Sequence, residues 1–310
     1  MGAIPFRQPL GSDTMPVVFM PAIPCIPFPG RALDPRSHTC AADGTPDESL
    51  FVIMTRSLTE LANMYGTDKG TIGPSAECSA HNYTDIYEAY LERHRRSALT
   101  ILEIGLGVTG ERWNARIVRG RNTGGASIKM WYDYFPNSQI YGIDLNECSC
   151  LDSDRVRTFV ADQGRVEDLD LFTEATGAIE FDVVVDDGSH RPDHQQVSFS
   201  YFFKKLKAGG LYFIEDLLSN GLGDGASGTM ACDNVRNTRS VLKQYLLQGS
   251  FLEPNAIMDQ AYLGTHIDSV SFHVPRVGVR HLFRSHLRRP IQKVVYYAPN
   301  TESLCAIRKK

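Results

Sequence analysis

Several acidic residues in this sequence follow directly after short apolar stretches. The clearest case is VVVDDGSHRPDHQQ, residues 183–196, where three valines precede Asp186-Asp187, and His190 and His194 follow. Carboxylates and imidazoles grouped in this way can bind a divalent metal ion or transfer a proton. The same pattern also suits a strand, a turn and a helix cap, so the surrounding sequence must decide between these interpretations.

Acids end four other apolar stretches in the same manner. They are Glu103, Asp144, Asp162 and the pair Glu215-Asp216. A single acid there would be an ordinary turn or capping residue, but five successive stretches share the feature. Ligands of open α/β sheets bind at the carboxyl ends of the strands. The acids therefore predict a common site at one edge of a sheet.

The elements that must position these acids alternate along the chain. Strand-like stretches are LTILEI, QIYGIDLN, RVRTFVADQG, FDVVVDDGSH and LYFIEDL, and alternating patterns at 269–275 and 292–298 suggest two hairpin strands. Helical patterns cover 48–64, 83–96, 126–135, 166–176, 194–208 and 234–248, with Gly209-Gly210 expected at a helix C-cap. Unbroken apolar strands that alternate with helices predict an α/β fold: a Rossmann-like, mostly parallel, doubly wound sheet with helices on both faces.

The domain organisation follows from composition. We expect a Pro-rich, flexible arm over residues 1–46, a helical cap over 47–98, the sheet domain over 99–275 and a basic, solvated extension over 276–310. The arm could wrap a partner subunit, and we expect a homo-oligomer.

The overall charge and the cysteines limit which partners and which cellular compartment we expect. The net charge of −4 gives no sign of a nucleic-acid partner. The apolar stretch from Pro16 to Pro29 is broken by further prolines and has no basic segment ahead of an unbroken apolar run, so we expect no signal peptide. No stretch reaches the length of a membrane span, and we expect no membrane partner. Seven cysteines are scattered without metal-site spacing, which predicts a reduced, cytoplasmic protein.

The glycines after the first strand indicate a cofactor site. Gly105 and Gly107 follow Glu103, and Gly110 completes a G-x-G-x-x-G pattern on paper. A long polar stretch follows instead of a helix, which argues against a nicotinamide enzyme. Carboxylates at the ends of the first two strands suit the amine and the ribose of S-adenosylmethionine, with Asp144 at the ribose. Asp162 and Gln163 would then lie near the adenine.

Several motifs together resemble one protein family. ILEIGLG, GGASIKMWYDYFPNSQIYGIDL, VADQ, VVVDDGSH and LKAGGLYFIEDL, with YGTDKG and HNYTDIYEAYL upstream, resemble the class I, metal-dependent O-methyltransferases of secondary metabolism. This group includes the macrolide-sugar and rhamnosyl O-methyltransferases and the cephalosporin-hydroxylase-like proteins. The resemblance covers about residues 57–220 and implies a class I methyltransferase fold that uses S-adenosylmethionine and Mg²⁺ or another divalent cation.

The resemblance also assigns roles to individual residues. It implies that Asp187, Glu215 and Asp216 hold the metal and that His190 is the general base. It places Glu103 and Asp144 among the cofactor contacts. The expected function is methyl transfer to a hydroxyl, or a carboxyl, of a small-molecule natural product. The loop Leu217-Leu218-Ser219-Asn220-Gly221 departs from the family pattern, so the resemblance does not specify a sugar acceptor.

Two other functions fit parts of the sequence. His190, His194 and Asp187 have the residue types of the two-histidine, one-carboxylate triad of Fe(II) oxygenases, which would make the protein a hydroxylase. That interpretation leaves Glu103 and Asp144 without a role. A non-catalytic scaffold with a methyltransferase fold is the third hypothesis, and it does not account for the acids and the histidine all being present.

Overall fold

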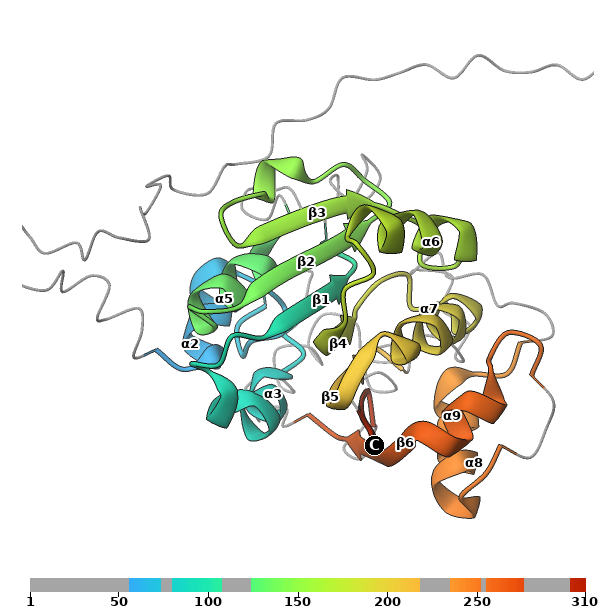
Figure 1. The fold of residues 1–310 in the computed structure, drawn as a ribbon. Coiled ribbons are helices and arrows are strands. Elements are labelled where there is room, and N and C mark those ends of the chain that lie inside the picture. The colour runs from blue at the N-terminus through green and yellow to red at the C-terminus, as the bar shows by residue number, and fades with distance from the viewer. Residues whose placement is uncertain (1–55, 74–79, 108–123, 218–234, 252–254, 276–301) are drawn as a thin grey trace, which may run out of the picture.

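The structure is a computed structural model of the 310-residue chain, and it describes residues 56–73, 80–107, 124–217, 235–251, 255–275 and 302–310 (Figure 1). The predicted N-terminal arm, Gly110 with the polar stretch after it, most of the loop after Asp216 and the predicted strand at 292–298 lie outside the described residues. In the part of the chain that is described, no helix has both the length and the apolar character needed to cross a membrane.

A seven-stranded sheet forms the centre of the fold, in the order β3-β2-β1-β4-β5-β7-β6. The first five strands are parallel, while β7 runs antiparallel to both of its neighbours. The strands are β1 (Thr100–Ile104), β2 (Gln139–Asp144), β3 (Val156–Val160), β4 (Phe181–Asp186), β5 (Leu206–Ile214), β6 (Ile267–His273) and β7 (Leu304–Lys309). The predicted mostly parallel, Rossmann-like sheet is confirmed.

Helices cover both faces of this sheet (Figure 1). On one face lie α2 (Leu58–Tyr65), α3 (Thr84–Leu91) and α5 (Ala126–Tyr134); on the other lie α6 (Val166–Ala175), α7 (Pro192–Lys204), α8 (Thr238–Gln248) and α9 (Gln260–His266). Alternate residues of each strand enter the two cores: Val183 and Val185 pack with the first group of helices, and Val184 packs with the second. Burial on both faces explains why the parallel strands are unbroken apolar stretches.

The structure corrects one predicted helix end and describes only part of another predicted helix. Residues 48–55 of the helix predicted over 48–64 lie outside the described residues, and α2 begins at Leu58, because Ser57 is extended and forms a capping box with Glu60. The predicted C-cap at Gly209-Gly210 lies inside β5 instead, since α7 ends at Lys204 and the strand starts at Leu206. A register shift between β4 and β5 absorbs these glycines, and Gly209 has a φ of 78°.

The C-terminal residues also differ from the expectation of a solvated basic extension. Residues 304–309 form β7, which inserts between β5 and β6. Lys309 is buried there, and its ammonium donates to the carbonyl oxygens of Lys204 and Leu206. The prediction of fully reduced cysteines fails at Cys150, which is disulfide-bonded, whereas Cys148 and Cys305 are free and buried.

Candidate active site

The carboxyl ends of β4 and β5 carry the three predicted metal ligands, of which Asp187 and Asp216, but not Glu215, belong to one open group. Asp186 pairs with Ile214 in the parallel register, and the Glu215 amide donates to the Asp186 carbonyl oxygen over 2.9 Å. Asp187 and Glu215 therefore leave the sheet side by side. The site lies near β1 and β4, where the strand order reverses, and such a reversal is where open α/β sheets form ligand crevices.

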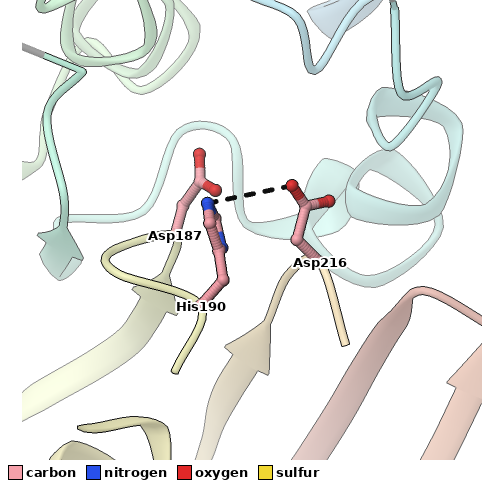
Figure 2. Close-up of side chains that lie close together, drawn as sticks. All are labelled: Asp187, His190 and Asp216. Atoms are coloured by element: carbon pink, nitrogen blue, oxygen red, sulfur yellow. Dashed lines mark ion pairs between the residues drawn. The ribbon is translucent and has the colours of Figure 1, made fainter. Parts of the chain in front are cut away.

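Asp187, His190 and Asp216 form a group with the geometry of a metal site (Figure 2). One ligand atom of each side chain lies within 4.8 Å of those of the other two. His190 Nε2 lies 3.9 Å from Asp216 Oδ2. All three side chains are partly exposed, so this group is open to an ion or a substrate.

The backbone at this group adopts conformations that are uncommon for residues with a side chain. His190 has a φ of 57° and Asp216 has a φ of 51°, and Asn82, on the neighbouring loop, has a φ of 57°. Left-handed backbone costs free energy for residues other than glycine and concentrates at functional sites. These values support a functional role for the turn after β4 and for the end of β5.

A second layer of side chains fixes Asp216. The Tyr83 hydroxyl donates to Asp216 Oδ1 over 2.6 Å, and His81 Nδ1 lies 3.5 Å from the same oxygen. Burial raises the pKa of Asp216, but His81 and His190, together with the Tyr83 hydroxyl and Lys69, more than offset burial and hold this pKa below its ordinary value. The Asp216 carboxylate is therefore anionic between two imidazoles.

The inner part of the site contains a buried cation, Lys69. Its ammonium pairs with the Asp187 carboxylate, lies 2.9 Å from Glu215 Oε1 and lies 3.6 Å from Glu103 Oε1. The side chains of Lys69, Glu103 and Glu215 are each no more than 1% exposed. Burial lowers the pKa of Lys69, but the three carboxylates raise it well above its ordinary value.

Glu215 lies entirely within this inner layer. Its Oε1 atom accepts a hydrogen bond from the Tyr87 hydroxyl, and its Oε2 atom is buried with no hydrogen-bond partner among the described residues. Burial, and then the nearby Asp187 carboxylate, raise the pKa of Glu215 well above its ordinary value. An unpartnered buried carboxylate oxygen costs free energy unless another group binds it.

Asp186 is not part of the open group of Asp187, His190 and Asp216; its side chain is buried in a hydrogen-bond network. Its carboxylate accepts hydrogen bonds from Gln163 Nε2 (2.9 Å), Ser198 Oγ (2.6 Å) and the Tyr212 hydroxyl (3.1 Å). Gln163 Oε1 in turn accepts from the Ser189 amide over 2.7 Å. The side chain of Gln163, a predicted cofactor contact, therefore ties the end of β3 to the turn after β4.

The remaining predicted cofactor residues follow β1 and β2. Gly105 has a φ of 84°, and a Cβ there would lie 2.3 Å from the Asp187 carbonyl oxygen, so the two loops approach too closely for a side chain. Gly107 has a φ of 66°, and within the described residues no atom lies within 4 Å of a Cβ added there. Asp144 Oδ2 accepts from the Leu106 amide over 2.8 Å, which fixes this glycine turn against β2.

Asp162 and His194 lie together, away from the group in Figure 2. His194 Nδ1 is 3.7 Å from Asp162 Oδ1, and His194 Nε2 is 3.9 Å from Asp193 Oδ2. Asp162 Oδ1 also accepts from the Gly164 amide over 2.9 Å. His194 is therefore not a member of the candidate metal group, and the triad of His190, His194 and Asp187 is not formed.

Comparison with known proteins identifies relatives of this chain. The mycinamicin VI 2''-O-methyltransferase of Micromonospora griseorubida is 36% identical over 161 residues, which are 52% of this chain and 36% of that protein. The L-olivosyl-oleandolide 3-O-methyltransferase of Streptomyces antibioticus is 34% identical over 215 residues, or 67% and 50% of the two chains. No family model matches the chain.

A solved structure supports the same relationship. MycE, the methyltransferase of the mycinamycin biosynthetic pathway in complex with Mg, SAH and mycinamycin VI, matches with a TM-score of 0.55 and 26% identity over 82% of this chain and 54% of that one. The chain is a homologue of the natural-product O-methyltransferases. It spans only 36% to 50% of the length of the two curated relatives above.

Within this methyltransferase homologue, sequence patterns located the strand-end acids but missed the groups behind them. Lys69 lies in a glycine-containing loop. The Lys69 carbonyl oxygen accepts a hydrogen bond from the Tyr83 amide over 2.9 Å. His81, Tyr83 and Tyr87 come from the following loop and α3. Tyr83 and Tyr87 are both buried. No periodicity signals that their hydroxyls point to Asp216 and Glu215.

Proposed function

We propose that this protein is an S-adenosylmethionine-dependent, metal-dependent O-methyltransferase that acts on a small-molecule natural product. The observation that carries this proposal is the convergence of Asp187, His190 and Asp216 beside the glycine turn after β1. A metal site and a cofactor turn at one sheet edge are what methyl transfer to a chelated oxygen requires.

Asp187, Asp216 and Glu215 are the proposed ligands of Mg²⁺ or another divalent cation. Hard carboxylate oxygens suit such an ion. The residues fit it, because Asp187 and Asp216 present oxygens to a common space and Glu215 Oε2 is a buried oxygen without a partner among the described residues. When bound, the cation lowers the pKa of a coordinated hydroxyl and fixes its position.

His190 is the proposed general base. Its ring is partly exposed, and Nε2 faces the Asp216 carboxylate, so an imidazolium formed by proton uptake would be stabilised there. The same position makes His190 a possible metal ligand, and the two roles predict different mutant behaviour. A base is dispensable for a carboxylic acid acceptor, which ionises near pH 4; an alcohol or phenol requires one.

Gly105, Gly107, Asp144 and Asp162 are the proposed cofactor contacts. The space around Gly107 within the described residues allows close approach of a ligand to the backbone. Asp144 lies at the end of β2, where a carboxylate can accept from ribose hydroxyls. Glu103 is fully buried against Lys69, so direct contact with the cofactor would require its side chain to move. Gln163 would act through the turn that it supports.

The acceptor that we propose is a hydroxyl group on a sugar of a glycosylated natural product. This rests on two relatives, the mycinamicin VI 2''-O-methyltransferase and the 8-demethyl-8-alpha-L-rhamnosyl tetracenomycin-C 2'-O-methyltransferase of Streptomyces olivaceus, the latter 38% identical over 160 residues. Self-association and the boundaries of the arm, cap and sheet domains remain predictions, to be measured by light scattering and limited proteolysis.

The test is turnover with S-adenosylmethionine and Mg²⁺ against a panel of glycosylated macrolides, their aglycones and matched carboxylic acids. We expect S-adenosylhomocysteine and a product heavier by one methylene only with a glycosylated acceptor, and loss of both products with EDTA. Turnover that persists in EDTA would contradict the metal-dependent mechanism. Methylation of aglycones or carboxylic acids alone would contradict the sugar acceptor.

A further inference from the structure

The buried ammonium of Lys69 lies where the proposed metal site is richest in carboxylates. It contacts Asp187 and Glu215, both proposed ligands, and lies 3.6 Å from Glu103. A lone buried ammonium would be strongly unfavourable, and so would three uncompensated carboxylates. Each therefore stabilises the other, without any bound metal.

Lys69 is held in this position by the backbone. Its carbonyl oxygen accepts from the Tyr83 and Thr84 amides, over 2.9 and 3.2 Å, which joins its loop to the start of α3. The carboxylates are held independently, because the Asp187 amide donates to the Ile104 carbonyl oxygen and the Glu215 amide donates to that of Asp186, both over 2.9 Å. The acids thus keep their backbone positions through the sheet, and the ammonium is not needed to place them.

The two oxygens of Glu215 have different environments. Oε1 is bound by Lys69 and Tyr87, while Oε2 has no hydrogen-bond partner among the described residues. Asp216, in contrast, faces His190 and His81. The cluster therefore has an inner half neutralised by an ammonium and an outer half that is open.

We infer that Lys69 is a built-in counter-ion that stabilises the metal-free site and weakens its affinity for divalent cations, so that the metal binds reversibly at the outer half. Lys69 is thus a positioning and affinity-setting residue rather than a catalytic one. This inference rests on the proposed metal-dependent function. It extends that function by assigning control of metal affinity to a residue outside the proposed ligand set.

An ammonium close to two ligands repels an incoming divalent cation, and this repulsion is large in a partly buried site. The sheet holds the backbone of the carboxylates without Lys69. Removal of the ammonium therefore removes its repulsion of the metal ion and leaves the carboxylate ligands in place. Lys69→Met should therefore bind Mn²⁺ at least about tenfold more tightly than the wild type.

Stability without metal should change in the opposite direction. Lys69→Met leaves Asp187, Glu215 and Glu103 without their cation, so the metal-free Tm should fall by about 10 °C. Saturating Mn²⁺ should raise the Tm of this variant more than that of the wild type. Lys207→Met is the matched control, because Lys207 Nζ pairs with Asp182 over 2.7 Å, a pair outside the candidate site.

The experiment is Mn²⁺ titration by electron paramagnetic resonance, with thermal unfolding in EDTA and in Mn²⁺, on the full chain. Tighter Mn²⁺ binding and a lower metal-free Tm in Lys69→Met, with neither in Lys207→Met, support the inference. Unchanged or weaker Mn²⁺ binding in Lys69→Met overturns it. Lys69→Arg, which keeps the charge, should not gain affinity.

A second variant keeps the test decisive if Lys69→Met does not fold without metal. Lys69→Met combined with Glu215→Gln removes one charge of each sign and should recover the folded state in EDTA. Failure of the double variant to recover overturns the counter-ion role. If the wild type binds no Mn²⁺, the proposed metal-dependent function fails, and the metal-free Tm values still test whether Lys69 stabilises the carboxylates.

Discussion

His190 Nε2 lies 3.9 Å from Asp216 Oδ2, and both residues have left-handed backbone conformations, with φ of 57° and 51°. The two residues are on different strand ends, after β4 and after β5. Each conformation is unfavourable for a residue with a side chain, so the fold holds both at a cost. Left-handed backbone at both positions marks the turn after β4 and the end of β5 as a candidate functional site.

His190→Gln should reduce kcat by about 10²–10⁴-fold if the acceptor is a hydroxyl, because the variant lacks a general base. Mn²⁺ affinity, measured by electron paramagnetic resonance, should stay close to that of the wild type, because a general base does not bind the metal. His194→Gln is the matched control, since His194 faces Asp162 rather than Asp216, and it should leave kcat unchanged. A large loss of Mn²⁺ affinity in His190→Gln would instead make His190 a metal ligand.

Asp187→Asn should weaken Mn²⁺ binding by at least about tenfold, because it removes one anionic ligand from the group in Figure 2. Asp182→Asn is the control on the same strand, since Asp182 pairs with Lys207 away from the site. Calorimetric titration of Mg²⁺ and Mn²⁺ measures both variants. Equal affinities for the two variants would exclude Asp187 from the metal site.

Gly105→Ala should lower the Tm and disrupt Mn²⁺ binding, whereas Gly107→Ala should lower the Tm less and leave Mn²⁺ binding intact. Both glycines have positive φ, which costs alanine about 1–2 kcal/mol. Only Gly105 also has a backbone neighbour, the Asp187 carbonyl oxygen, 2.3 Å from an added Cβ. Similar behaviour of the two variants in thermal unfolding and metal titration would refute this steric explanation.

Gln163→Leu should destabilise the protein by about 2–4 kcal/mol, because it leaves the Ser189 amide and one Asp186 oxygen without their partner. Urea unfolding measures this change. Gln139→Leu, at an exposed position at the start of β2, should change the free energy of unfolding by less than about 0.5 kcal/mol. Equal stabilities of the two variants would show that Gln163 does not support the turn after β4.

The sequence predicted the parallel sheet and its acids because burial on both faces leaves a local pattern. Each apolar stretch ends where the strand reaches the open edge, so Asp187 and Glu215 could be located without knowledge of their partners. Lys69 could not be predicted, since it lies 118 residues before Asp187, in a polar loop, and only the folded chain brings the two together.

Other differences have equally specific causes. The end of the chain reads as basic, but Lys309 places its ammonium against two backbone carbonyl oxygens and so allows β7 to enter the sheet. Gly209-Gly210 has the composition of a helix C-cap, and the β4–β5 register shift accommodates these residues within a strand instead. In both places the local sequence fits two structures, and a long-range contact within the sheet determines which of them forms.

The most direct test of the account uses S-adenosylmethionine labelled with carbon-13 in its methyl group, bound to the protein in the presence of Mn²⁺. If the cofactor and the metal occupy adjacent positions at this sheet edge, the paramagnetic ion should broaden the methyl resonance. This broadening should disappear in Asp187→Asn and persist in Asp182→Asn. A bound cofactor whose methyl resonance is unaffected by bound Mn²⁺ would contradict the proposed metal-dependent methyl transfer.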